Sequence, residues 1–340
     1  MFQPKYTITH RLLANIKQIT ALIAGLNSRS FPRPVLVEME RRARETSAYS
    51  STSIEGNPLP LTEVKRILKN RPEHLRDTER EVINYNQALE ALNAHINRGG
   101  VRLNLGLILD VQKKITRQLL EPYRCGRWRT ESVFVNNPKT GKTVYWPPDH
   151  PNVKELMDDL IGFVNAHRKN IDPLILAGLF HKQFVIIHPF IDGNGRTARL
   201  ATKVILAAMG LNTFNLFSFE NYYNRNVSRY FDKVGVLGNY YEIKDKIDFS
   251  EWLEYFSDGI IDELLRVTKE LDAAAISPQT AIYHYHQAIL EHIKKHGYIT
   301  DKQYSGMTKR ARATRNLDFK KLITLGHIQK YGKGKGTYYK

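Results

Sequence analysis

Apolar residues along this chain recur mostly three and four positions apart, a spacing that places them on one side of an α-helix. The stretch from residue 14 to 26 is typical, because Ile16, Ile19 and Ile23 form a single stripe there. The same spacing predicts helices over residues 14–26, 35–53, 62–68, 79–97, 108–119, 153–167, 173–187, 196–209, 221–236 and 249–275. The chain is therefore predicted to be mainly α-helical.

The pattern changes after Gly126. Ser132–Val135 and Thr143–Trp146 are short runs rich in β-branched and aromatic residues, and the segment between them contains Asn, Pro and Gly. Such a sequence predicts a β-hairpin, which Pro147 and Pro148 end.

The composition narrows the class of protein. Cys125 is the only cysteine among the 340 residues, and a single thiol makes neither an intramolecular disulfide nor a multi-cysteine zinc site. No stretch approaches the roughly 18 apolar residues of a membrane span, and the first residues lack a secretory signal pattern. We therefore expect a soluble, cytoplasmic protein with no membrane partner.

Positive charge is concentrated near the C-terminus. The whole chain carries a net charge of +17, from 51 Lys and Arg against 34 Asp and Glu. Residues 281–340 hold 13 basic and three acidic residues, so a sixth of the chain contributes +10. Ser277-Pro278-Gln279 has the composition of a linker, and the segment after it is predicted to be a separate basic module.

The basic module has a recognisable order of predicted elements. These are helices over 286–296, 300–307 and 311–325, followed by a hairpin rich in Lys and Gly over 331–339. The order resembles a winged helix-turn-helix, with residues 310–321 as the recognition-type helix and Lys333 and Lys335 in the wing. Basic residues placed in this way suit phosphate backbones, so DNA is an expected partner. Modules of this kind also dock proteins, and that alternative stays open.

The segment 188–199, HPFIDGNGRTAR, carries the chemistry. Two glycines flank Asn194 directly before a predicted helix, so free backbone N–H groups and the positive helix end converge on one anion site. Arg196 and Arg199 lie three residues apart, near one face of the first turn of that helix. The glycines also imitate a dinucleotide-binding fingerprint, but they follow a helix and not a β-strand.

Two more side chains complete the site. Asp192 supplies a hard oxygen ligand suited to a phosphate-bound Mg²⁺, and His188 supplies a proton acceptor that works near neutral pH. An anion site, a metal ligand and a base within twelve residues predict an active site that handles a nucleotide.

The same segment resembles the Fic family signature, His-x-Phe-x-Asp/Glu-Gly-Asn-Gly-Arg-x-x-Arg, at every specified position. The resemblance implies transfer of AMP from ATP to a Ser, Thr or Tyr hydroxyl of a target protein, with self-modification included. It implies that His188 deprotonates this hydroxyl and that Asp192 holds Mg²⁺. The residues implied to bind the phosphates are Gly193, Gly195 and Asn194 for the α-phosphate, Arg196 for the β-phosphate and Arg199 for the γ-phosphate.

The hairpin, with Gly126 and Arg129 before it, resembles the flap of the family. An exposed strand edge at 132–135 or 143–146 would pair with an extended target segment. The residues that this assigns to target docking are Val133, Phe134, Val135, Val144 and Tyr145. Tyr230 and Phe231 resemble the aromatic residues on the adenine side of the family's site, although a core position is an equal alternative.

A second motif lies upstream. Ser51-Thr52-Ser53-Ile54-Glu55-Gly56 resembles the inhibitory motif Ser/Thr-x-x-x-Glu-Gly/Asn that accompanies many Fic domains. Ser51 and Glu55 are four residues apart and share a helix face, and Glu55 stands at the helix end, before Gly56. A carboxylate projecting there is expected to pair bidentately with Arg199 and deny it to the γ-phosphate.

These observations predict three parts: an N-terminal helical region with the inhibitory motif (1–100), a Fic catalytic core (101–276) and a winged helix (281–340). The expected activity is Mg²⁺-dependent protein adenylylation from ATP, held low by Glu55. Expected partners are ATP, a target protein, DNA through 281–340 and a second copy of the chain in a homodimer. Two alternatives stay open: a DNA-binding regulator whose Fic core senses a nucleotide, and a Fic enzyme with another nucleotide reaction, such as removal of AMP.

Overall fold

The computed structural model describes residues 2–70, 72–137, 140–211, 215–275 and 282–340. The chain divides into two compact units. The first comprises Met1–Ser28 and Arg42–Val267, and the second comprises Arg29–Arg41 and Thr268–Lys340. The linker predicted at Ser277–Gln279 lies outside the described residues.

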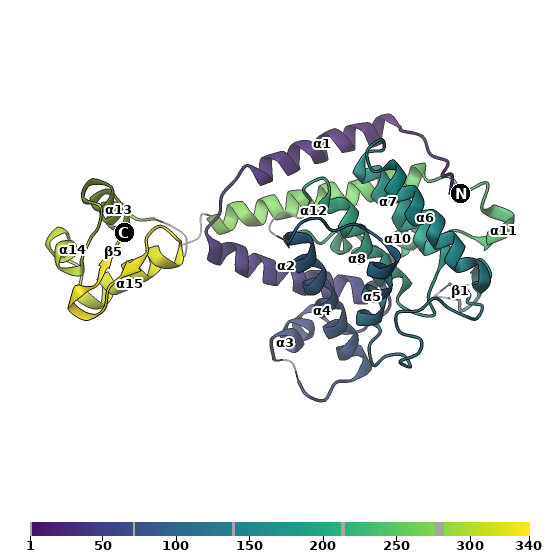
Figure 1. The fold of residues 1–340 in the computed structure, drawn as a ribbon, viewed down its shortest axis with the longest axis horizontal. Helices are drawn as coiled ribbons and strands as arrows, with labels where there is room; N and C mark the ends of the chain where they lie inside the picture. Colours follow the sequence, from purple (N-terminus) through teal and green to yellow (C-terminus); the bar gives the residue numbers. More distant parts are fainter. Residues whose placement is uncertain (1, 71, 138–139, 212–214, 276–281) are drawn as a thin grey trace. The chain divides into compact units, whose positions relative to one another are not determined.

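Helices make up most of the described chain, which confirms the predicted class (Figure 1). Their bounds up to the basic module are α1 (His10–Asn27), α2 (Arg33–Ile54), α3 (Leu61–Asn70), α4 (Asp77–Asn97), α5 (Leu105–Ile115), α6 (Val153–His167), α7 (Pro173–Ile187), α8 (Asn194–Ala207), α9 (Glu220–Asn224), α10 (Val227–Val234), α11 (Tyr240–Ile243) and α12 (Ser250–Ala275). The helices α6 and α7 have the predicted bounds.

Three helix predictions need correction. The helix expected over 221–236 is two helices, because the Asn226 side chain accepts a hydrogen bond from the Arg229 backbone N–H and starts α10 afresh. The helix expected to continue to residue 119 ends at Ile115, shortly before Gln118 adopts a φ of 59°. The helix expected over 62–68 is longer at both ends, since α3 begins at Leu61 and ends at Asn70.

The predicted hairpin is part of a three-stranded sheet. Its strands are β1 (Val135–Asn136), β2 (Thr143–Trp146) and β3 (Gly238–Asn239), in the order β1-β2-β3. The first strand is shorter than expected: it begins at Val135, and Val133 and Phe134 lie before it. The strand β2 pairs antiparallel with β1 and parallel with β3, which occupies its other edge at Tyr145 and Trp146. A free edge at those two residues is therefore a wrong prediction.

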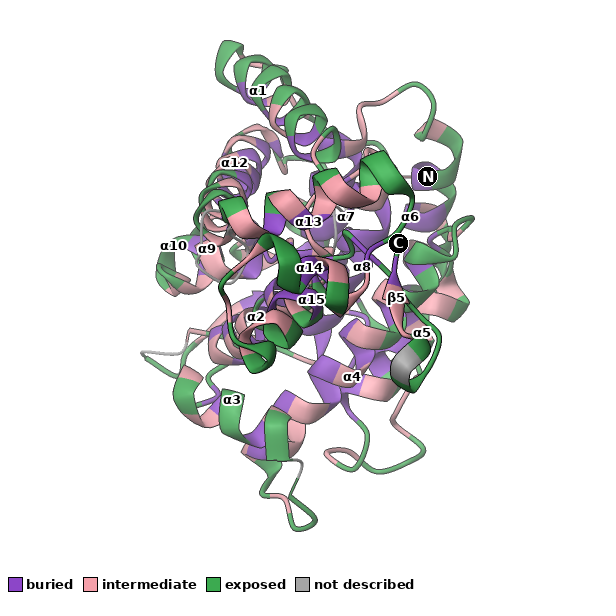
Figure 2. Cartoon of the chain, turned by 90° about the vertical axis from the view of Figure 1, so that its left-hand side faces the viewer, coloured by how far each residue is buried: buried purple, intermediate pink, exposed green. Residues whose placement is uncertain are grey.

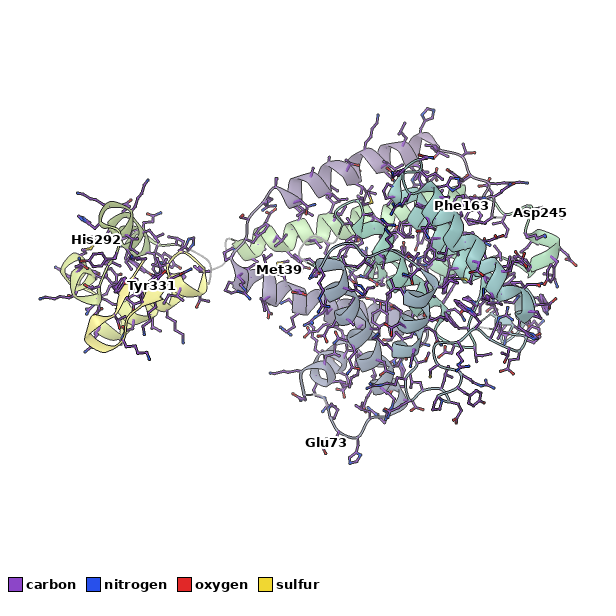
Figure 3. The ribbon with its side chains drawn as sticks, viewed as in Figure 1. Met39, Glu73, Phe163, Asp245, His292 and Tyr331 are labelled. Carbon is purple, nitrogen blue, oxygen red and sulfur yellow. The ribbon has the colours of Figure 1, made fainter. Side chains whose placement is uncertain are left out.

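Helix α7 lies at the centre of the core of the first unit (Figure 2). It is apolar around nearly its whole circumference and packs most extensively on α8, as expected for a helix that neighbours enclose. Gly178 on α7 brings α12 close, and the Trp252 indole N–H donates to the Gly178 carbonyl at 2.8 Å. Phe163 of α6 packs edge-on against Phe2, with ring centroids 5.0 Å apart, and so fixes the N-terminal segment (Figure 3).

The basic module has the predicted order of elements. Its helices are α13 (His284–His296), α14 (Asp301–Met307) and α15 (Arg312–Thr324), followed by the antiparallel strands β4 (Lys330–Tyr331) and β5 (Tyr338–Tyr339). Its own small core consists of Ile289, Ile299, Tyr304, Phe319, Leu322, Ile328 and Tyr339. In the described part of the whole chain, no helix combines the length and apolarity needed to cross a membrane.

Candidate active site

His188 caps the C-terminal end of α7 in the left-handed conformation, with φ 51° and ψ 59°. Its Nδ1 lies 3.2 Å from the Val185 carbonyl oxygen, which only accepts, so Nδ1 carries the proton and Nε2 is left as the basic atom. Burial lowers the pKa of His188, and the nearby positive charge of Arg129 acts in the same direction. The imidazole is therefore neutral, and able to accept a proton, at and above neutral pH.

The loop after His188 is tied together by Asn194. Its side-chain oxygen accepts from the Phe190 N–H and its amide donates to the Phe190 carbonyl, both at 2.9 Å. Phe190 is fully buried and stacks on Trp128, with ring centroids 5.1 Å apart. The Asn194 amide, predicted to stabilise the α-phosphate, is thus already engaged within the loop, because its two polar atoms hold the turn closed. The second N–H of this amide and the backbone N–H groups are left as donors for an anion.

The two glycines of the motif serve different purposes. Gly193 has a φ of 83° and caps the start of α8, and a Cβ there would lie 2.9 Å from the Ile115 side chain. A Cβ on Gly195 would overlap the Glu55 carboxylate. The Glu55 carboxylate therefore lies directly against the N-terminal turn of α8, the end of a helix that favours an anion.

Replacing Gly193 tests how strictly this turn is built. We expect Gly193→Ala to lower the free energy of unfolding by about 2 kcal/mol, because an L-residue in the left-handed region costs roughly 1–2 kcal/mol and its Cβ also meets Ile115. Gly162→Ala on α6 is the matched control, since its Cβ meets nothing within 4 Å and alanine favours a helix. Urea denaturation of both variants decides; equal stability would contradict the steric role of Gly193.

Arg199 is completely buried and contacts Ser51 and Glu55. Its Nη2 lies 2.7 Å from Glu55 Oε1 and 2.8 Å from the Ser51 carbonyl oxygen, and its Nε donates to the Ser51 hydroxyl at 2.8 Å. The predicted ion pair is present, but it uses one carboxylate oxygen and is not bidentate, because the Ser51 carbonyl shares the same nitrogen. Burial opposes the charge of Arg199, yet the Glu55 carboxylate keeps its pKa above the ordinary value.

Arg196 is held by two carboxylates. Its Nη2 donates to both oxygens of Asp192, at 2.7 and 2.8 Å, and its Nη1 donates to Glu81 of α4. The other Glu81 oxygen accepts from the Asn57 amide at 2.6 Å. Burial raises the pKa of Glu81, with the Arg196 charge opposing. The sequence analysis missed Glu81, because a glutamate on a helix that is mostly polar outside its buried stripe gives no local sign of a partner 115 residues away.

Asp192 suits a metal ion that arrives with a nucleotide. Its side chain is 46% exposed, and the described residues contain no cluster of three or more His, Cys, Asp or Glu that could hold a metal alone. Mg²⁺ is commonly bound by one or two carboxylates together with substrate phosphates. One exposed carboxylate beside an anion site fits that requirement.

The aromatic and flap residues separate into buried and accessible groups. Tyr230 is buried, and its hydroxyl lies 3.4 Å from Arg199 Nη1. Phe231 is 39% exposed, because successive helix residues point about 100° apart. In the flap, Tyr145 is buried and donates to the Ile186 carbonyl at 2.8 Å, whereas Phe134 is 56% exposed. Val133, Val135 and Val144 are half-buried.

Arg129 connects the flap to the signature. Its backbone N–H donates to the Pro189 carbonyl at 3.0 Å, and its Nε donates to the His188 carbonyl at 2.8 Å. The sequence analysis singled out this arginine only as a neighbour of the flap. Its contacts show that it fixes the backbone at His188 and Pro189.

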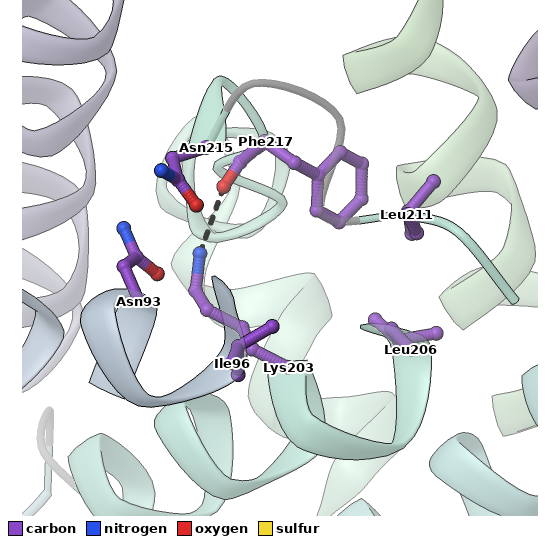
Figure 4. A pocket seen from close by; sticks show the side chains of 7 residues that line it. All are labelled: Asn93, Ile96, Lys203, Leu206, Leu211, Asn215 and Phe217. Atoms are coloured by element: carbon purple, nitrogen blue, oxygen red, sulfur yellow. Dashed lines mark hydrogen bonds between the residues drawn. The ribbon is translucent and has the colours of Figure 1, made fainter. Parts of the chain in front are cut away.

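Figure 4 shows a pocket that none of these groups lines. In this pocket Lys203 donates to the Phe217 carbonyl at 2.8 Å. The pocket is lined by Asn93, Ile96, Lys203, Leu206, Leu211, Asn215 and Phe217. None of these residues belongs to the segment 188–199, so we assign the pocket no part in the chemistry.

Comparisons with known proteins agree with this geometry. The chain is 31% identical over 180 residues to the protein adenylyltransferase fic-1 of Caenorhabditis elegans, covering 51% of this chain and 34% of that protein. It is 28% identical over 190 residues to the protein adenylyltransferase Fic of Aedes aegypti, covering 55% and 36%. The chain thus spans about a third of the length of these curated relatives.

Solved structures share the fold. A Fic family protein from Desulfovibrio desulfuricans has a TM-score of 0.67 at 20% identity, covering all of this chain and 98% of that one. A Fic-1 fragment from Caenorhabditis elegans has a TM-score of 0.60 at 22% identity, covering 77% and 73%. Residues 102–206 match the sequence profile of the Fic/DOC family. The resemblance is therefore confirmed: the chain contains a Fic domain.

Proposed function

We propose that this chain transfers AMP from ATP to a hydroxyl side chain of a target protein and that Glu55 holds the activity low. One observation carries the proposal: the Glu55 carboxylate lies on the N-terminal turn of α8 and on the buried Arg199. The helix end and Arg199 form a site suited to an anion, and the Glu55 carboxylate of the chain itself lies in that site. The relatives named protein adenylyltransferase support the same activity.

The geometry suggests how each residue acts. His188 Nε2 takes the proton of the target hydroxyl, whose oxygen then bonds to the α-phosphorus while the bond from that phosphorus to the bridging oxygen breaks and pyrophosphate leaves. The backbone N–H groups of residues 193–195 stabilise the charge on the α-phosphate. Arg196 and Arg199 neutralise the β- and γ-phosphates. Transfer of this kind depends mainly on positioning and charge neutralisation.

Asp192 is the residue that would hold Mg²⁺, and the ion would neutralise phosphate charge. The Arg196 contact to both Asp192 oxygens keeps that carboxylate in place beside the anion site.

Inhibition in this proposal is competition for Arg199. The Nη2 atom already makes two contacts, to Glu55 and to Ser51, so a γ-phosphate gains this nitrogen only when the carboxylate leaves. Glu55 follows the last helical residue of α2 and its side chain is 27% exposed, which leaves it a path to solvent. The target would dock along the outer edge of β1, beside the exposed Phe134.

The position of the label in ATP tests the reaction. In Glu55→Gly protein, we expect label at the α-position to appear on protein, on an added target or on the chain itself, and label at the γ-position not to appear. Transfer of γ-label would show kinase-like chemistry. Absence of both labels, with nucleotide still bound, would favour the nucleotide-sensing regulator; release of AMP from a labelled target would favour the reverse reaction.

A second proposal concerns the basic module, which we infer to be a winged helix that binds DNA. Arg312 and Lys320 are exposed on α15, and the Lys340 ammonium lies over the stacked wing rings of Tyr331 and Tyr338. Basic side chains neutralise the phosphates of a nucleic acid, and exposed aromatic rings can stack on its bases.

Two arginines expected to face DNA are engaged within the module. Arg310 donates to Asp318 at 2.7 and 3.0 Å, and Arg315 donates to Asp301 at 2.8 and 2.9 Å. Arg310 also precedes α15 and lies over the Tyr285 ring. The two pairs stabilise the module, so the phosphate contacts fall to other basic side chains.

Salt-dependent mobility shifts test this second proposal. Replacing Arg312 and Lys320 by alanine is expected to reduce the slope of log affinity against log salt by about 2, roughly one unit for each phosphate contact. Replacing the exposed Lys65 and Lys69 of α3 is the charge-matched control. An unchanged slope, or no shift by the whole chain at low salt, would refute DNA binding through this face and favour a protein-docking module.

A further inference from the structure

One buried titratable group plays no part in the chemistry above. His181 lies on α7, seven residues before His188, and it is fully buried. Both of its ring nitrogens have partners: Nδ1 lies 3.1 Å from the Thr202 hydroxyl of α8, and Nε2 lies 3.0 Å from the Tyr230 hydroxyl of α10. The three helices that surround the anion site, α7, α8 and α10, therefore meet at this imidazole.

The direction of each hydrogen bond in this chain can be deduced. The Thr202 hydroxyl donates its only proton to the Ala198 carbonyl, at 2.7 Å, so its oxygen accepts from His181 Nδ1. Burial, with the nearby Arg199 charge, lowers the pKa of His181 well below its ordinary value, so the ring holds one proton. With that proton on Nδ1, the Nε2 atom accepts, and the Tyr230 hydroxyl donates to it.

This direction decides what Tyr230 offers to Arg199. The phenol keeps its proton, since burial raises its pKa to about 12. Because that proton points to His181, the lone pairs of the oxygen are left for Arg199 Nη1, 3.4 Å away. The donors therefore run in one order, from Arg199 to Tyr230, to His181, to Thr202 and to the Ala198 carbonyl.

We propose that Tyr230 and His181 are positioning residues that hold the Arg199 guanidinium for the terminal phosphate and so set a preference for nucleoside triphosphate over diphosphate. The proposal rests on the function proposed above. When Glu55 leaves, Arg199 keeps its neutral acceptors on Tyr230 and Ser51. Neutral acceptors orient the guanidinium without cancelling its charge, whereas a second carboxylate would compete with the phosphate for it.

Nucleotide affinities in the Glu55→Gly protein test the proposal by calorimetry with ATP and with ADP. Tyr230→Phe removes only the hydroxyl, and we expect it to weaken ATP binding by about five- to tenfold, with ADP binding within about twofold. This is the usual contribution of one neutral hydrogen bond, since the 3.4 Å contact acts on the phosphate only through Arg199. An equal loss for ATP and ADP would show a merely structural role, and no loss for either would overturn the proposal as well.

Two further variants separate positioning from packing. Tyr223→Phe is the matched control, because the Tyr223 ring stacks on Tyr230 but its buried hydroxyl has no hydrogen-bond partner in the described part of the chain. It should leave the ATP-to-ADP ratio unchanged. His181→Gln can still donate to Thr202 and accept from Tyr230, so it should keep the preference that His181→Leu loses.

Thermal melting of each variant identifies any that do not fold. If His181→Leu is unfolded, the ATP-to-ADP affinity ratios of His181→Gln and Tyr230→Phe still test the proposal. Loss of the preference for ATP in His181→Gln would contradict the deduced hydrogen-bond directions. Failure of the parent Glu55→Gly protein to bind either nucleotide would refute the proposed function itself and is a separate outcome.

Discussion

Glu55→Gly protein is expected to transfer AMP about ten- to a hundredfold faster than the wild type. The change removes the carboxylate that occupies Arg199 Nη2 and the anion site at α8, and a hydrogen bond between charged partners contributes roughly 1.5–3 kcal/mol. The measurement is the initial rate of α-label transfer at equal protein and ATP concentrations. The variant loses both contacts of the Glu55 carboxylate together, the one with Arg199 and the one beside Gly195.

The matched control is Glu73→Gly, which removes a carboxylate from an exposed loop residue between α3 and α4 (Figure 3). It should transfer at the wild-type rate. Equal rates for Glu55→Gly and wild type would show that Glu55 does not restrain the enzyme. A second readout supports the same account: Glu55→Gly leaves Arg199 buried without its carboxylate, so its melting temperature without nucleotide should fall and should recover when ATP is added.

His188→Ala in the Glu55→Gly protein is expected to lower the transfer rate by about 10²- to 10⁴-fold, the usual contribution of a general base. ATP affinity should change little, because the imidazole is assigned to the hydroxyl and not to the phosphates. His150→Ala, which removes an exposed histidine from the turn before α6, is the control and should retain full activity. A His188→Ala protein with undiminished transfer would refute the assignment of the base.

The pH profile of the Glu55→Gly protein, in which His188 is intact, gives a further check. The pKa of His188 is lowered, so the neutral ring persists as pH falls to its ordinary pKa, and transfer is lost only when the ring is protonated below that point. The acid limb of kcat/KM should therefore lie below pH 6.5. An acid limb above this value would contradict burial as the dominant influence on His188.

Local signals explain what the sequence could predict. The bounds of α7 follow from Pro173 at its first position and from the apolar runs 174–180 and 184–187, the second of which ends at His188. The contact between Glu55 and Arg199 was predictable because each residue belongs to a short motif with its own spacing. A contact leaves no local trace in the sequence when a residue's partner lies on another helix. Nothing local in the sequence indicates that Glu81 meets Arg196 or that His181 meets Tyr230.

Short elements set a second limit. The strand β3 consists of Gly238 and Asn239 alone, which is too short to give any alternating pattern, so its pairing with β2 could not be foreseen. The loop contacts of the Asn194 side chain could not be foreseen for a related reason. Its two hydrogen bonds close a five-residue loop, and the sequence does not show whether a turn amide faces inward or toward a ligand.

The affinity for ATP and for ADP in wild-type and Glu55→Gly proteins tests the central claim most directly, since it needs neither a target protein nor catalysis. If the Glu55 carboxylate holds Arg199 in place of the γ-phosphate, calorimetry should show ATP binding at least about tenfold tighter in Glu55→Gly than in the wild type. The gain for ADP should be clearly smaller, because ADP shares the anion site at α8 but has no γ-phosphate. The same ATP affinity in both proteins, or an equal gain for ATP and ADP, would contradict it.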